Sequence, residues 1–386
     1  MPEQHRTSRS LTCPVHARKA SRTPVVTAVP TRPYPETVEG LRVNSLSVKW
    51  PDGSDALRAV GLAAGPGEVL AILGPTGSGK TTLLRTLAGL EKGHGEVRLS
   101  GKDLASLPPH ARGVAMASQE PALYPHLTVE QNIALSGELR GRADAGSRAR
   151  ASAAALGITD LLARAPSTLS GGQRQLASLA RVLAARPSIA LLDEPLASLD
   201  APARVGLRPA LHALLRGLGC PALYVTHDHE EAMAIGDRLL IMRSGGVEQT
   251  GTGAELFAQP ANTFVASFLG SPPMNLIEGA ASGGVFTPDR AGAPVVPVPA
   301  RVTDSRVTLG IRPRECEVVA ADAALRAEVR RITFVSGEWD VWLELPGGAP
   351  LLCRCGEPPG AGVGVAVGVR ASRLHWFGPD GAALGT

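Results

Sequence analysis

The chain has 386 residues, of which 44% are hydrophobic, and a formal net charge of +4 at pH 7. This length predicts about two to three globular domains with a sizeable core. No apolar stretch approaches the ~20 residues of a membrane-spanning helix, which argues against an integral membrane subunit. The aromatic content is only 3% and no basic stripe is present, so nucleic-acid binding gains no support.

Residues 1–37 are rich in proline, serine and threonine and contain few acidic groups. The segment lacks the apolar core of a secretory signal. An arginine-rich, acid-poor leader is also typical of organelle import. A start codon assigned too far upstream would likewise add a segment of this composition. We predict a disordered extension and assign it no function.

The phosphate-binding motif GPTGSGKT occupies residues 74–81, between an apolar run at 69–73 and a segment of helical spacing at 82–88. Glycines let main-chain N–H groups turn toward a polyphosphate, and the following helix N-terminus favours the anion. Lys80 would reach the β- and γ-phosphates, and the Thr81 hydroxyl would be a ligand of Mg²⁺. The predicted nucleotide contacts in this segment are Gly74, Pro75, Thr76, Gly77, Ser78, Gly79, Lys80, Thr81 and Thr82.

Three further groups follow predicted strands along the chain. Gln119 comes after the run at 114–117, and its carbonyl suits Mg²⁺ or water. Asp193 and Glu194 end the run at 188–192, where α/β sheets place ligands. Asp193 can hold Mg²⁺ through its hydration shell, and Glu194 can polarise a water for in-line attack on the γ-phosphate.

His227 follows the apolar run at 222–225, and there a neutral imidazole can contact the γ-phosphate and fix the attacking water. Each of these residues has an ordinary alternative. A lone histidine is usually structural, an exposed glutamine carries little information, and an Asp-Glu pair is commonly solvated.

The ordered set, together with LSGGQ at residues 169–173, resembles the ATP-binding subunits of ABC transporters over residues 41–269. Strings at 112–116, 122–129, 224–228 and 270–275 are most similar to importer ATPases of the maltose, glycerol-phosphate and multiple-sugar type. The resemblance implies that Trp50 stacks on adenine. It also implies that Ser170, Gly172 and Gln173 touch the γ-phosphate on an opposite subunit, so two ATP molecules lie at a dimer interface.

The same resemblance implies partners. These are a second ATPase subunit, two transmembrane permease subunits and, indirectly, an extracytoplasmic solute-binding protein. Residues 124–132 would receive a coupling helix of the permease, although a plain loop and amphipathic helix is the ordinary alternative. The implied location is the cytoplasmic face of the membrane, as a peripheral subunit, with a homodimer or heterodimer left open.

The sequence departs from the family pattern at three places. Ser118 stands where phenylalanine is usual, which puts the packing of that loop in doubt. Ala197 stands where serine is frequent, with Ser198 one place later, so cross-dimer contacts there are in doubt. Leu176 replaces a common arginine. None of these removes a group needed for hydrolysis.

After residue 275 the chain changes to short β-prone runs at 307–313, 331–335, 339–343 and 374–377, between glycines and prolines. We predict a small all-β barrel that resembles the oligonucleotide-binding-type (TOBE) accessory domain of such ATPases. It could bind a ligand, a regulator or a second copy of itself, and dimer stabilisation is the plainest role.

The expected fold is therefore α/β, a P-loop NTPase with a RecA-like core and a helical subdomain, followed by the OB-like barrel. The expected domains are residues 38–270, with the helical subdomain at about 120–180, and residues 271–386. The expected function is the ATPase of a carbohydrate or polyol phosphate importer, with ATP and Mg²⁺ as cofactors.

Alternatives remain at this point. One is an importer ATPase for an inorganic ion, iron, sulfate or a polyamine. A soluble ABC ATPase acting on ribosomes or DNA usually carries two cassettes or a coiled coil, neither of which this sequence contains. A regulatory nucleotide-binding module is a third. The five cysteines lack a paired or zinc-binding spacing and are expected to be reduced thiols.

Overall fold

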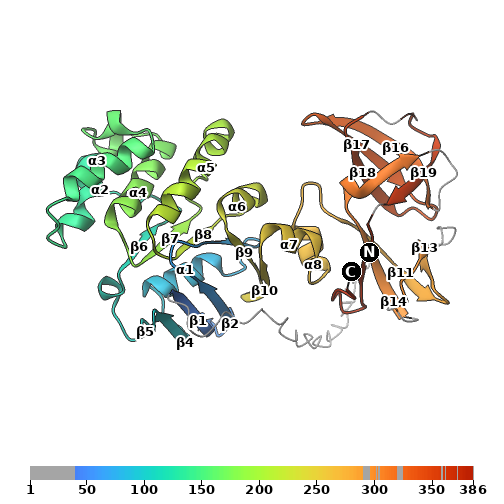
Figure 1. The fold of residues 1–386 in the computed structure, drawn as a ribbon, viewed down its shortest axis with the longest axis horizontal. Helices are drawn as coiled ribbons and strands as arrows, with labels where there is room; N and C mark the ends of the chain where they lie inside the picture. Colours follow the sequence, from blue (N-terminus) through green and yellow to red (C-terminus); the bar gives the residue numbers. More distant parts are fainter. Residues whose placement is uncertain are drawn as a thin grey trace, which may run out of the picture.

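The computed structural model describes residues 40–289 and, with short gaps, 296–385. The described chain forms two lobes (Figure 1), an α/β lobe that ends with α8 and an all-β lobe that begins with β11. The extension predicted at 1–37 lies outside the described residues.

A six-stranded sheet lies at the centre of the α/β lobe, in the order β10-β9-β3-β8-β7-β6. Strands β3, β6, β7, β8 and β9 pair in parallel, and β10 adds an antiparallel edge. Every residue of β3 and β7 is buried, which explains their uninterrupted apolar sequences. The bounds are β3 Val69–Leu73, β6 Val114–Ala117, β7 Ile189–Asp193, β8 Ala222–Val225, β9 Arg238–Arg243 and β10 Gly246–Gly251.

A second, antiparallel sheet in the order β2-β1-β4-β5 covers one face of this lobe. Its strands are β1 Leu41–Lys49, β2 Asp55–Ala64, β4 His94–Leu99 and β5 Lys102–Asp103. Helix α1 (Lys80–Ala88) contributes Leu83, Leu84 and Leu87 to the core that this sheet shares with β3, β7 and β8. The helix that follows the phosphate-binding motif is thereby fixed from two sides.

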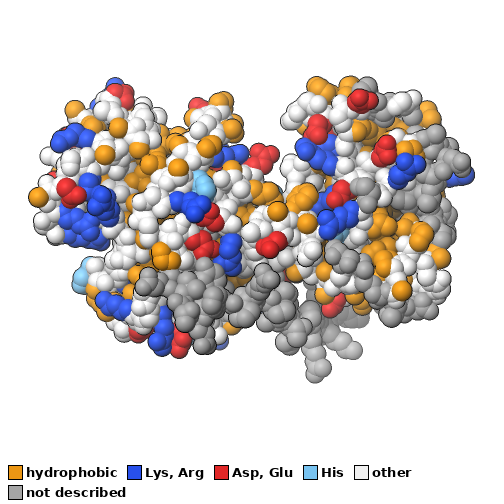
Figure 2. All heavy atoms as spheres, viewed as in Figure 1, with side chains coloured by type: hydrophobic (Ala, Val, Ile, Leu, Met, Phe, Trp, Pro, Cys, Tyr) orange, Lys and Arg blue, Asp and Glu red, His pale blue; other side chains and the backbone are white. Residues whose placement is uncertain are grey.

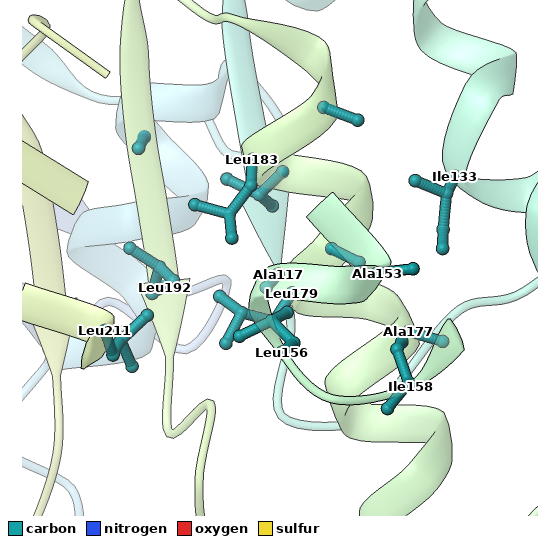
Figure 3. Close-up of a cluster of buried hydrophobic side chains, with 14 of the residues drawn as sticks. Ala117, Ile133, Ala153, Leu156, Ile158, Ala177, Leu179, Leu183, Leu192 and Leu211 are labelled. Atoms are coloured by element: carbon teal, nitrogen blue, oxygen red, sulfur yellow. The ribbon is translucent and has the colours of Figure 1, made fainter. Parts of the chain in front are cut away.

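Helices cover the opposite face of the central sheet. They are α2 (Val129–Glu138), α3 (Ala145–Ala155), α4 (Gly171–Ala185) and α5 (Ala201–Gly217). Figure 3 shows Leu179 and Leu183 of α4 in one apolar cluster with Leu192 of β7 and Leu211 of α5. Helix α4 therefore connects the helical layer directly to the strand that ends at Asp193. Helices α2 to α4 occupy the stretch in which the helical subdomain is predicted.

Helices α6 (His229–Ile235), α7 (Gly253–Ala258) and α8 (Thr263–Phe268) complete the α/β lobe. Leu256 of α7 and Val265 of α8 pack with Leu239 and Ile241 of β9. Short 3₁₀ turns lie at Pro109–Ala111, Thr159–Leu161, Pro166–Thr168 and Pro313–Glu315. The α/β core with a helical layer agrees with the predicted fold class.

The second lobe contains two five-stranded antiparallel sheets, β13-β12-β11-β14-β20 and β15-β19-β16-β17-β18. In the second sheet the edge strand β15 also approaches β18, so the sheet curls toward a closed barrel. The bounds are β11 Asn275–Ser282, β12 Val285–Pro288, β13 Val296–Pro297, β14 Ser305–Ile311, β15 Cys316–Val319, β16 Leu325–Val335, β17 Glu338–Glu344, β18 Pro350–Cys355, β19 Ala366–Ala371 and β20 His375–Phe377. One core joins both sheets, as expected for a small all-β domain, and each predicted run contains a strand.

Besides the connecting chain, hydrogen bonds join the two lobes in two regions of the described chain. Arg312, which follows β14, donates hydrogen bonds to the carbonyls of Phe257, Ala266 and Leu269 in the α/β lobe. The C-terminal segment returns to the same region (Figure 1), where Thr263 N–H donates to Gly381 O and Ala383 N–H donates to Ala261 O, each at 2.9 Å. The β lobe is therefore attached at both ends of its sequence.

Figure 2 shows Lys and Arg side chains intermixed with Asp and Glu on the visible face of both lobes. Among the described residues, no helix combines the length and the apolar character that crossing a bilayer requires. The cysteines within the described part of the chain, Cys220, Cys316, Cys353 and Cys355, form no disulfide.

Candidate functional site

The predicted site residues from four strands meet at one edge of the central sheet. In register, Ala117 of β6 pairs with Leu192, and Asp193 of β7 pairs with Val225 of β8. Val225 in turn pairs with Ile72 at the end of β3. The phosphate-binding loop, His227, the Asp193-Glu194 pair and Gln119 therefore follow the carboxyl ends of neighbouring parallel strands, where a ligand crevice forms.

The loop at 74–79 is closely surrounded by main chain. A Cβ on Gly74 would lie 2.3 Å from Met242 O, and one on Gly79 would lie 2.7 Å from Ala56 O. Gly79 also has a φ of 99°, which glycine adopts without strain. Only glycine fits these positions, so the loop can present its N–H groups inward.

Lys80 begins α1, and its ammonium donates to Gly74 O at 2.7 Å and to Pro75 O at 3.0 Å. The side chain thus lies over the mouth of the loop. Burial lowers the pKa of Lys80, and the nearby carboxylates of Glu194 and Asp193 oppose that shift. A buried ammonium beside a cradle of N–H donors is suited to a polyphosphate.

Asp193 is 2% exposed, and burial raises its pKa, although a hydrogen bond from the Thr81 hydroxyl acts in the opposite direction. Its Oδ1 has no hydrogen-bond partner among the described residues. A buried carboxylate with a free oxygen beside a hydroxyl fits a hard divalent cation such as Mg²⁺. Within the described chain no cluster of three acidic, histidine or cysteine side chains could hold the ion alone, so phosphate and water oxygens would complete its shell.

Glu194 and His227 lie next to each other at this edge. Glu194 Oε1 lies 3.2 Å from His227 Nδ1, with the carboxylate side chain 18% exposed and the imidazole 63% exposed. The Glu194 N–H donates to Val225 O at 2.9 Å. Glu194 has a φ of 47°, a left-handed backbone that is unusual for a residue with a side chain.

The LSGGQ segment at residues 169–173, the signature segment, lies at the start of α4. Ser170 accepts a hydrogen bond from Gln173 N–H at 3.3 Å, and the Gln173 side chain accepts one from Ser170 N–H at 3.0 Å. This reciprocal arrangement is a capping box. A Cβ on Gly172 would lie 3.1 Å from Ser198 O, so the helix start packs on the turn after Glu194. Within the described chain no hydrogen bond joins these residues to the phosphate-binding loop.

The remaining predicted residues lie at the rim. Trp50 is 42% exposed in the turn between β1 and β2, and β2 reaches the loop because Ala56 lies against Gly79. Gln119 is exposed one residue after Ser118, whose hydroxyl donates to Glu120 O. Asp200, next to the altered Ala197-Ser198 pair, caps α5 by accepting from Ala203 N–H.

Sequence reasoning missed one buried group beside the site. Gln175 of α4 is 2% exposed, and its side-chain amide donates to Glu194 O at 2.9 Å. No sequence pattern marks this bond, because its acceptor is main chain. The capping box, by contrast, is visible as serine followed three residues later by glutamine, and the pattern could have been recognised.

Residues 57–197 match the family model described as ABC transporter. Among curated proteins, the sn-glycerol-3-phosphate import ATP-binding protein UgpC of Chromohalobacter salexigens is 42% identical over 80% of this chain and 85% of its own. The UgpC proteins of Ralstonia nicotianae and Salmonella typhi are 38% and 41% identical, over 85% and 71% of this chain and 94% and 79% of their own.

Among solved structures, the dimeric post-hydrolysis state of the ATP-binding cassette MJ0796 bound to ADP and Pi is similar. Its TM-score is 0.51 and its sequence identity is 28%, and the match covers 55% of this chain and 98% of the solved chain. A second dimeric structure of MJ0796, described as a bacterial ABC transporter cassette, matches equally well. The aligned share fits the α/β lobe described above.

Proposed function

This chain belongs to the ATP-binding subunits of ABC transporters, which hydrolyse ATP, and on that premise we propose that it drives import of a polyol phosphate or related carbohydrate. The observation that carries the proposal is the similarity to UgpC proteins, which extends over both lobes and most of their own length. The names of these proteins give sn-glycerol 3-phosphate as the imported solute. This solute is the first to test.

In the proposed reaction, N–H groups of residues 74–81 and the Lys80 ammonium bind the phosphates of ATP. Trp50 stacks on the adenine, and Thr82 gives a further phosphate contact. Thr81, Asp193 and Gln119 would hold Mg²⁺, and the ion would supply positive charge beside the β- and γ-phosphates. The free Oδ1 of Asp193 and the exposed amide of Gln119 support this ligand set.

Glu194 accepts a proton from a water molecule while the oxygen of that water attacks the γ-phosphorus. The bond between the γ-phosphorus and the bridging oxygen breaks, and ADP and inorganic phosphate are the products. His227 is placed to align the water and to keep the Glu194 carboxylate in one orientation, since its Nδ1 lies 3.2 Å from Glu194 Oε1. The short distance to His227 and the low exposure of the Glu194 side chain, 18%, support these roles.

A second chain would complete the site of each chain. Ser170, Gly172 and Gln173 contact each other and the turn after Glu194 rather than their own phosphate-binding loop. We infer that they face the γ-phosphate held by a second copy, in a homodimer that encloses two ATP molecules. The dimeric state of MJ0796 with ADP and Pi supports this arrangement.

The permease would contact the helical layer. A groove of about 340 Å³ lies between β6, α2 and α4, and its lining includes Met116, Leu135 and Val182. At its rim Tyr124 and Leu139 are 48% and 79% exposed. A groove that combines apolar side chains with polar ones such as Arg140 and Arg181 suits a short amphipathic helix. The permease subunits would hold this chain at the cytoplasmic face of the membrane, with a solute-binding protein on the other side.

The test is import into proteoliposomes that contain this chain, its two permease subunits and the solute-binding protein. We expect MgATP-dependent uptake of sn-glycerol 3-phosphate. Glu194→Gln should still bind ATP but lose turnover and uptake by about 100-fold or more. Glu317→Gln, an exposed carboxylate on β15, is the matched control and should keep both activities.

Two outcomes would contradict the proposal separately. Undiminished ATP hydrolysis by Glu194→Gln would overturn the assignment of the base. Uptake of sulfate, iron or a polyamine in place of the polyol phosphate would overturn the solute class while leaving the hydrolytic mechanism intact.

A further inference from the structure

Gln175 is an unusual residue because it is buried, polar and bonded to a reactive segment. Its side chain is 2% exposed, and its Nε2 donates to Glu194 O at 2.9 Å. Its Oε1 has no partner in the described part of the chain. The amide orientation follows from the acceptor, because a reversed amide would place two carbonyl oxygens together.

A buried amide with one unsatisfied oxygen weakens folding, since desolvation of that oxygen is not compensated. An apolar side chain of similar shape would avoid this loss. Stability of the fold therefore does not explain why a glutamine at position 175 donates a hydrogen bond to Glu194 O. Its target, Glu194, has the left-handed φ of 47°, a conformation that persists only where neighbouring groups hold it.

Two more contacts hold the Glu194 main chain. Its N–H donates to Val225 O at 2.9 Å, and its carbonyl also accepts from Ala197 N–H at 3.2 Å. These bonds come from β8 and from the turn itself. Among the hydrogen bonds of the Glu194 main chain within the described residues, the Gln175 bond is the one that comes from α4, the helix that begins at the LSGGQ segment.

We propose that Gln175 is a positioning residue through which α4 sets the orientation of the Glu194 carboxylate. The start of α4 packs on the same turn, because a Cβ on Gly172 would meet Leu199 Cδ2 at 2.9 Å. The helix thus contacts the segment at 194–199 at two points one turn apart. A displacement of α4 moves the main chain of Glu194 and, with it, the carboxylate.

This inference rests on the proposed function, in which Glu194 takes the proton and Ser170 faces a second copy. One rigid helix then presents Ser170 to the nucleotide of the partner and Gln175 to the base of its own site. Correct contact with the ATP of the partner fixes α4, and α4 fixes the base beside its own ATP. The two sites are coupled through a single helix.

The test uses Gln175→Met, which keeps the length of the side chain and removes its N–H. The Glu194 carbonyl still accepts from Ala197 N–H, so we expect little change in thermal stability. We expect kcat for ATP hydrolysis to fall about 10- to 100-fold, because a small misplacement of a catalytic group has effects of this size. The dissociation constant for ATP should stay within twofold.

The matched control is Ser178→Ala, which removes another buried polar group of α4 that has no described partner. It should leave kcat within twofold. Similar kcat losses in both variants, or weaker ATP binding in proportion to the loss of turnover by Gln175→Met, would indicate a structural role and overturn the proposal.

A double-mutant cycle distinguishes the proposal from the function on which it rests. If Gln175 acts through Glu194, adding Gln175→Met to Glu194→Gln should not lower the residual hydrolysis further. Additive losses would overturn the positioning role, as would full activity of Gln175→Met beside an inactive Glu194→Gln. Full activity of Glu194→Gln would instead overturn the assignment of the base. Should Gln175→Met fail to fold, Gln175→Leu undergoes the same cycle.

Discussion

Some buried polar residues of this protein form hydrogen bonds whose acceptors cannot be recognised from the sequence. The strands at 69–73, 189–193 and 222–225 are predictable because their apolar runs end in residues of evident chemistry. Gln175 and Arg312 were not, because both donate to main-chain carbonyls. A carbonyl is the same at every position, so such a bond leaves no pattern in the sequence. The site was predictable as a list of groups, whereas the contacts that orient them were not.

His375 of β20 gives a prediction of pH dependence at this scale. It is 4% exposed, with Nε2 3.8 Å from Glu315 Oε2. Burial first, and then the charges of Arg312 and Arg373, lower its pKa from 6.5 to about 4. Because the unfolded chain takes up the proton more readily, the neutral imidazole stabilises the fold above pH 6.5. This contribution, at most about 3 kcal/mol, is lost as the pH falls toward 4.

Chemical denaturation at pH 7.0, 5.5 and 4.5 should therefore give falling free energies of unfolding. His375→Asn should have a smaller slope, and His94→Asn, an exposed histidine on β4, should keep the original one. Burial raises the pKa of Glu315 above its usual 4.5, an effect of opposite sign that offsets part of the loss as the pH falls toward 4.5. An unchanged slope in His375→Asn would show that another group titrates.

Helices α2 and α4 begin with the same type of N-terminal cap. Thr128 and Gln131 form a capping box at α2, as Ser170 and Gln173 do at α4. Loss of a capping hydroxyl costs about 1 kcal/mol of stability. We expect Thr128→Ala and Ser170→Ala to lower the free energy of unfolding by similar amounts, measured by urea denaturation.

Their activities should differ, because only α4 is proposed to face a partner nucleotide. Ser170→Ala should reduce ATP turnover by at least 10-fold, and Thr128→Ala should leave it within twofold. Equal activities in the two variants would mean that the hydroxyl of Ser170 serves only to cap the helix. Because both variants lose a capping hydroxyl, their comparison distinguishes an effect on stability from an effect on ATP turnover.

For the whole molecule, Arg312 connects the two lobes. Its guanidinium is 2% exposed, donates to Phe257 O and Ala266 O at 2.9 Å each and to Leu269 O, and lies 4.0 Å from the centre of the Phe257 ring. Burial lowers its pKa to about 10, so it remains charged at neutral pH. Three carbonyls of the α/β lobe depend on this one side chain from the β lobe.

Arg312→Ala should lower the free energy of unfolding by about 3 kcal/mol or more and should split the calorimetric transition into two. Arg314→Ala is the matched control, since its exposed ion pair with Glu338 contributes at most about 1 kcal/mol. A single transition with unchanged midpoint in Arg312→Ala would show that the connecting chain alone holds the lobes together.

The attachment of the β lobe at both ends of its sequence has a mechanical consequence. A domain fastened by one linker can swing independently, but this one is anchored by Arg312 and by the returning segment at 381–383. Both anchors form hydrogen bonds with residues in α8 or next to it. Any rotation of that short helix during the ATP cycle is therefore transmitted to the β lobe as rigid-body tilt.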